Sequence, residues 1–175
     1  MSFLFPHPFL SLNNMACLLK TNEKEEKGGS GLNVITDFLE RKEAKKLRLE
    51  RSMLVELSLV AIAKDARKSF FSYRERSLFV QRELEEMCID VAIDAYLAGV
   101  SYSRFYVLGE TEEDVRKRAD TELKQFTEML FDYWLFWGDY DAVLEGLNHT
   151  CELFIERWWR VGLEKGTKRH RLRLH

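Results

Sequence analysis

The sequence predicts an all-α fold, an antiparallel four-helix bundle with a flexible N-terminal extension and a basic C-terminal tail. Three observations support it. Both prolines, Pro6 and Pro8, lie near the start, so none interrupts a later helix. Apolar residues recur at alternating spacings of three and four, which is the period of a helix with one buried face. Long helical stretches joined by short loops favour antiparallel neighbours.

The 175 residues are expected to divide into three parts. Residues 1–31 end in a charged and then glycine-rich stretch, which is typical of a flexible linker. Residues 32–166 are expected to form the helical domain. Residues 167–175 form a basic tail, and a tail of this kind is more often disordered than bound.

Four helices are expected, over residues 37–70, 73–98, 112–137 and 140–164. Gly99 is expected to end the second helix and Thr111 to cap the third. Residues 100–109 are expected to form a connector, and Gly162 and Gly166 to mark the fraying end of the fourth helix. Residues 53–63 are apolar on nearly every side, which predicts burial on several sides.

The third helix carries more apolar side chains than one seam buries. Phe131, Leu135 and Phe136 lie outside its seam of residues spaced by three and four. Each helix of a small bundle normally buries one face, so the surplus predicts a homodimer interface. The alternative is that these side chains belong to the core.

Composition limits the classes of function. The net charge is −2, so a protein built mainly to hold nucleic acid is not expected. The three cysteines are scattered, which fits no zinc site or disulfide framework and predicts a cytoplasmic protein. No apolar run approaches the roughly 20 residues of a membrane span. The basic tail leaves contact with nucleic acid or an anionic membrane surface as alternatives.

Three acids stand inside the two most apolar helical stretches, and they are the candidate polar site. Asp90 and Asp94 are one turn apart and share a face, and Glu56 approaches them if the first two helices pack together. Buried carboxylates need a partner. A structural network with Arg67, Arg104 or a connector hydroxyl is the simpler reading, and a ligand pocket or metal-dependent enzyme is the alternative.

No metal site is predicted elsewhere. Glu145, His149, Glu152 and Glu156 are residues of metal-binding type, but helical geometry turns them away from the apolar seam and toward water. The sequence does not identify a cofactor.

Glu83 and Glu86, followed by Asp90 and Asp94, are similar to the magnesium-binding acids of all-α nucleotide pyrophosphohydrolases of the MazG type. The later Glu-x-x-Asp pair of those enzymes is missing at a suitable spacing. The likeness covers only one helix. Its small extent and the missing pair put magnesium-dependent nucleotide hydrolysis in doubt.

Two segments carry a further resemblance. The stretch from Asn33 to Lys42, leading to Glu50-Arg51, and the stretch from Val91 to Phe105 resemble a family of small uncharacterised proteins from spore-forming bacilli, classed as a domain of unknown function. The resemblance implies a bacterial cytoplasmic protein and no catalytic residues. The leading hypothesis is therefore a non-enzymatic helical protein that acts through protein–protein contacts, including self-association.

Overall fold

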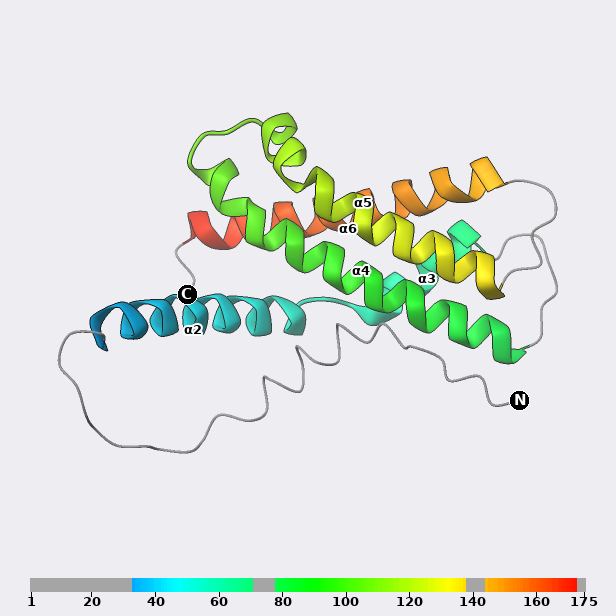
Figure 1. Ribbon diagram of the computed structural model, residues 1–175, viewed down its shortest axis with the longest axis horizontal. Coiled ribbons are helices and arrows are strands. Elements are labelled where there is room, and N and C mark those ends of the chain that lie inside the picture. Colours follow the sequence, from blue (N-terminus) through cyan, green and yellow to red (C-terminus); the bar gives the residue numbers. More distant parts are fainter. Residues whose placement is uncertain (1–32, 71–77, 138–143, 173–175) are drawn as a thin grey trace. The chain divides into compact units, whose positions relative to one another are not determined.

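The structure is a computed structural model that describes residues 33–70, 78–137 and 144–172. These residues form α2 (Asn33–Val55), α3 (Leu59–Phe70), α4 (Leu78–Val107), α5 (Glu112–Trp137) and α6 (Leu144–Arg171) (Figure 1). The all-α prediction is confirmed. The flexible extension predicted for residues 1–31 lies outside the described residues. Contacts divide the chain into two compact units, residues 1–40 and residues 41–175, and the second unit contains the core.

The single helix expected over residues 37–70 is wrong, because a turn at residues 56–58 divides it into α2 and α3. The backbone N–H of Glu56 donates to the carbonyl of Met53 at 3.2 Å, a tightened last turn. The hydroxyl of Ser58 then accepts the backbone N–H of Ala61 at 3.3 Å and caps α3. Burial on several sides is also wrong here, since Met53 is buried but Val55 and Val60 are exposed.

The expected helix stop at Gly99 is wrong, because α4 continues through the predicted connector to Val107. The stop lies ten residues later, at Gly109, whose φ of 104° is in the left-handed region that favours glycine. The N–H of Gly109 donates to the carbonyl of Tyr106 and that of Glu110 to the carbonyl of Phe105, both at 3.2 Å. These two bonds form a Schellman cap.

The fraying end expected at Gly162 and Gly166 is wrong as well, because α6 continues to Arg171. Both glycines face α4 in the middle of a helix–helix contact. A Cβ at Gly162 would overlap the carbonyl oxygen of Tyr96, and one at Gly166 would collide with Ser103. Small residues at such spacings let two helix backbones approach closely.

Gly99 has the same role on α4, where a Cβ would overlap the carbonyl oxygen of Trp159. Residues 96, 99 and 103 thus meet residues 162, 163 and 166 in the same order, so α4 and α6 run in the same direction. The second and fourth helices of an up-down bundle are also parallel, but they lie on its diagonal. Here they are in direct contact, and the four-helix bundle is not confirmed.

The third expected helix is confirmed at both ends. The hydroxyl of Thr111 accepts the backbone N–H of Asp114 at 3.2 Å and caps α5. The ring of Trp137, at the end of α5, lies 6.2 Å from that of Phe79, at the start of α4. α5 therefore runs opposite to α4 (Figure 1).

The core lies among α4, α5 and α6, with α3 packed across them. Its largest fully buried side chains include Trp134, Trp159 and Phe154. Phe70 of α3 stacks on Trp134, with ring centroids 4.8 Å apart. None of the described helices has the length and apolar character needed to cross a bilayer.

Candidate functional site

The four residues of the predicted polar site lie in three places. Glu56, at the turn between α2 and α3, accepts a hydrogen bond from Nη1 of Arg169 on α6 at 2.9 Å. The guanidinium of Arg104 lies over the ring of Phe105 at 4.7 Å. Only Asp90 and Asp94 lie together, on one side of α4.

Asp94 is the titratable carboxylate most affected by its surroundings. Burial, followed by the charges of Asp90 and then Glu122, raises the pKa of Asp94 to about 6. Burial and then the charge of Glu86 also raise the pKa of Asp90, which is the more exposed of the two. The neighbouring charges that shift both groups are acids, so this part of the α4–α5 boundary disfavours the ionised form of both carboxyls.

Glu56 and the pair formed by Asp90 and Asp94 lie on different sides of α4. The hydroxyl of Tyr96 donates to the carbonyl of Met53 at 3.3 Å, so Tyr96 faces the end of α2. Asp94 precedes Tyr96 by two residues, about 200° around the helix, and therefore points to the other side of α4. Glu56 pairs with the guanidinium of Arg169 instead. The role of Asp90 and Asp94 as a ligand site stays a prediction.

The sequence interpretation missed Glu122 and Tyr102 as members of this acidic region. Burial, then the charge of Glu122 and a hydrogen bond with it, raises the pKa of the Tyr102 phenol. These neighbours depend on the register between α4 and α5, for which the sequence carries no local signal. Among the described residues, no set of three or more His, Cys, Asp or Glu side chains is arranged to hold a metal ion.

Two cysteine thiols lie in the core and are free. Burial raises the pKa of Cys151 to about 12 and shifts the pKa of Cys88 upward as well. A nucleophilic thiol requires the thiolate form at neutral pH. Cys88 and Cys151 are therefore packing residues.

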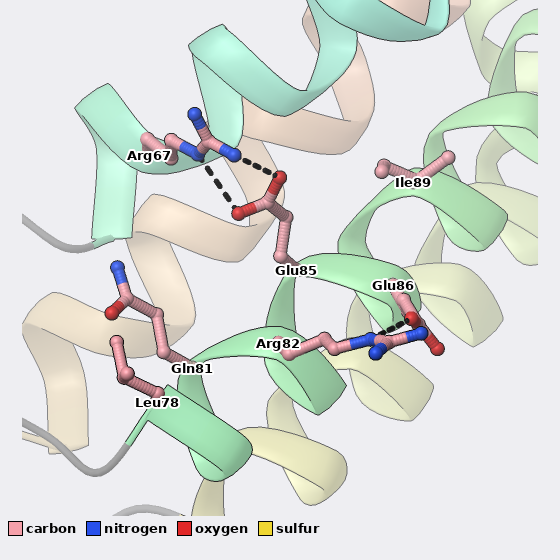
Figure 2. A pocket seen from close by; sticks show the side chains of 7 residues that line it. All are labelled: Arg67, Leu78, Gln81, Arg82, Glu85, Glu86 and Ile89. Atoms are coloured by element: carbon pink, nitrogen blue, oxygen red, sulfur yellow. Dashed lines mark hydrogen bonds and ion pairs between the residues drawn. The ribbon is translucent and has the colours of Figure 1, made fainter.

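An open groove of about 620 Å³ lies between α3 and the start of α4 (Figure 2). Its charges are already paired: Arg67 donates two hydrogen bonds to Glu85 at 2.8 and 2.7 Å, and Arg82 donates one to Glu86 at 2.8 Å. Arg67 was a possible partner for the predicted acids, and it binds Glu85 instead. The charges that line the groove therefore cancel, and the groove offers an ionic ligand no excess of opposite charge.

Aromatic side chains gather where the start of α4 meets the end of α5. We call this set the aromatic surface, and it consists of Phe79, Tyr133, Phe136 and Trp137. Trp137 contacts both Phe79 and Phe136 edge-on, with ring centroids 6.2 and 5.4 Å apart. Phe79 and Phe136 are each 63% exposed. Solitary exposed apolar side chains are common, whereas a contiguous cluster of this kind marks a surface for association.

The predicted interface residues fall on different sides of α5. Phe136 belongs to the aromatic surface, and Leu135 is less exposed, at 37%. Phe131 is partly buried against the core. Phe79, Tyr133 and Trp137 were missed as surface residues, although their apolar character at a helix end was visible in the sequence.

Comparisons with known proteins identify a family and a relative of this chain. Residues 32–175 match the family described as "Protein of unknown function (DUF2521)". The chain is also similar to "Uncharacterized protein YbaK" of Bacillus subtilis (strain 168), with 31% identity over 147 residues, covering 80% of this chain and 97% of the relative. No solved structure matches.

Proposed function

The chain belongs to the DUF2521 family, and from its geometry we propose a non-enzymatic protein that acts through protein–protein contacts, above all with a second copy of itself. The observation that carries this proposal is the aromatic surface. The proposal includes a cytoplasmic location, which the free thiols of Cys88 and Cys151 support.

Aromatic side chains contribute most of the energy at protein interfaces, because each buries about 150–250 Å² of surface. Phe79 and Phe136 expose most of their surface to water while Trp137 holds both in place. Rings fixed in this way lose little side-chain freedom on binding, which favours association.

The surrounding charges allow a second copy to be the partner. Arg82 and Glu86, which follow Phe79 along α4, form an ion pair within one chain at 2.8 Å. Two identical surfaces related by a twofold axis therefore meet with compensated charge at this edge. Twofold pairing of identical patches is the commonest form of protein assembly.

The test is sedimentation of the full chain over a range of concentrations. We expect a mass approaching twice the 20.7 kDa of one chain as the concentration rises, with dissociation on dilution. A single-chain mass at every concentration would contradict self-association, and the aromatic surface would then need another protein as its partner.

A further inference from the structure

The end of α2 and the end of α6 meet at one surface. Arg169 of α6 contacts both Glu56, at 2.9 Å, and the sulfur of Met53, at 3.9 Å. Val161 of α6 packs against the small core cluster that contains Met53 and Tyr96. The last residues of α2 and residues 161–169 of α6 are therefore neighbours in space.

This surface is strongly basic. Residues 41–56 and 164–172 together contain ten Lys or Arg side chains and four Asp or Glu side chains. The whole chain has a net charge of −2, so all other residues together carry −8. Every one of the ten basic side chains except that of Arg169 is exposed. We call this set of ten the basic surface.

Helical geometry distributes these side chains around the contact between the two helices. Lys165, Lys168 and Leu172 follow Val161 at spacings of four, three and four, so they continue the side of α6 that faces α2. On α2, Met53 points inward, and Arg48, Arg51 and Val55 share the opposite, outward side.

Exposed aliphatic side chains lie among these charges. Val55 is 87% exposed, Val60 is 79% exposed and Leu172 is 67% exposed. Val55 and Val60 flank the turn that contains Glu56, and Leu172 follows the last basic residue of α6. Aliphatic groups and exposed bases thus occupy the same surface.

We propose that the basic surface binds the face of an anionic lipid bilayer. Basic side chains near such a surface are attracted to its phosphates, and aliphatic side chains beside them enter the headgroup layer. The phosphates of a nucleic acid would pair with the basic side chains, but a nucleic acid does not explain why Val55 and Val60 are exposed beside them. Residues 41–60 and 161–172 also contain no Phe, Tyr or Trp on which unpaired bases stack.

This proposal is independent of self-association. Phe79, at the aromatic surface, and Val100, beside Met53, are 21 positions apart on α4, or about 32 Å along a helix. Failure of one proposal therefore leaves the other standing.

The test is co-sedimentation of the full chain with phosphatidylcholine vesicles, with and without phosphatidylglycerol. We expect binding only to the anionic vesicles. Arg48→Glu with Lys165→Glu should weaken it by at least about 25-fold, since each basic residue near the surface contributes about fivefold. Val55→Ser with Val60→Ser should weaken binding without changing the charge.

The control is Lys117→Glu with Lys124→Glu, which makes the same change of charge on α5 and should leave vesicle binding nearly unchanged. An equal loss in the control, no binding by the unmodified chain, or full binding by the Val55→Ser, Val60→Ser variant would overturn the proposal. Tighter binding to duplex DNA than to anionic vesicles would do so too, and would identify the basic surface as a nucleic-acid site.

Discussion

Gly162 on α6 lies against the carbonyl oxygen of Tyr96 on α4, in a space that one methyl group would overfill. The obstructing atom belongs to the backbone of a buried helix, so it cannot turn aside as a side chain can. The parallel contact between α4 and α6 depends on this arrangement.

Gly162→Ala is expected to lower the free energy of unfolding by about 3 kcal/mol or more, because the two backbones must move apart. Chemical denaturation followed by circular dichroism measures this change. The matched control is Gly146→Ala, at an exposed position of the same helix, which should stabilise by up to about 1 kcal/mol through helix propensity. A neutral Gly162→Ala would mean that α4 and α6 are not in close contact.

Asp94→Asn is expected to stabilise the protein at neutral pH but not in acid. The folded-state pKa of Asp94 is raised to about 6 from 3.8, so its ionised form is unfavourable when folded. The penalty is absent below about pH 4, grows as the pH rises toward 6 and is complete above it. With allowance for screening by water at this partly buried site, the gain at neutral pH is about 1–2 kcal/mol.

The measurement is the free energy of unfolding of both proteins across this pH range. Glu152→Gln, at an exposed position of α6, is the control and should change stability by less than about 0.5 kcal/mol at every pH. Destabilisation by Asp94→Asn at neutral pH would show that the carboxylate has a cationic partner.

Asp65 is expected to be a structural anchor for α3. Its carboxylate accepts hydrogen bonds from Arg157 and, at 3.2 Å, from the indole N–H of Trp158, both on α6. Asp65→Ala leaves the indole donor of the buried Trp158 without its partner and should destabilise by about 1–3 kcal/mol. Asp120→Ala, which removes pairs with Arg116 and Lys124 along α5, should change stability by less than about 1 kcal/mol. Equal effects in thermal unfolding would argue against the anchor.

Local signals in the sequence predicted α5 correctly and failed at the glycines. Thr111, the acidic first turn and the apolar seam are all features within one helix, so they define α5 without knowledge of its neighbours. The sequence predicts that Gly99 and Gly162 lie at helix ends, whereas both lie inside helices. A glycine that ends a helix and one that admits a neighbouring backbone look alike in sequence, because the difference depends on the packing partner.

The candidate site also has a part that follows from one helix alone and a part that depends on how helices pack. Asp90 and Asp94 share a side of α4 because they are one turn apart, which the sequence states directly. Whether Glu56 joins them depends on how α2 meets α4 and α6, and there Arg169 is its partner. The apolar surplus of α5 was visible, but only the register with α4 joins Phe136 through Trp137 to Phe79.

Self-association through the aromatic surface is tested most directly by comparing the dimer dissociation constants of Phe136→Glu and Leu153→Glu in sedimentation equilibrium. Both changes put a carboxylate on an exposed apolar position, since Phe136 is 63% exposed on α5 and Leu153 is 47% exposed on α6, outside the aromatic surface. Phe136→Glu is expected to raise the dissociation constant by at least about 30-fold, the loss of one central aromatic contact, with helicity unchanged. Leu153→Glu is expected to leave it within about threefold of the unmodified chain. A dimer that survives Phe136→Glu, or one that Leu153→Glu disrupts equally, would contradict the aromatic surface as the interface.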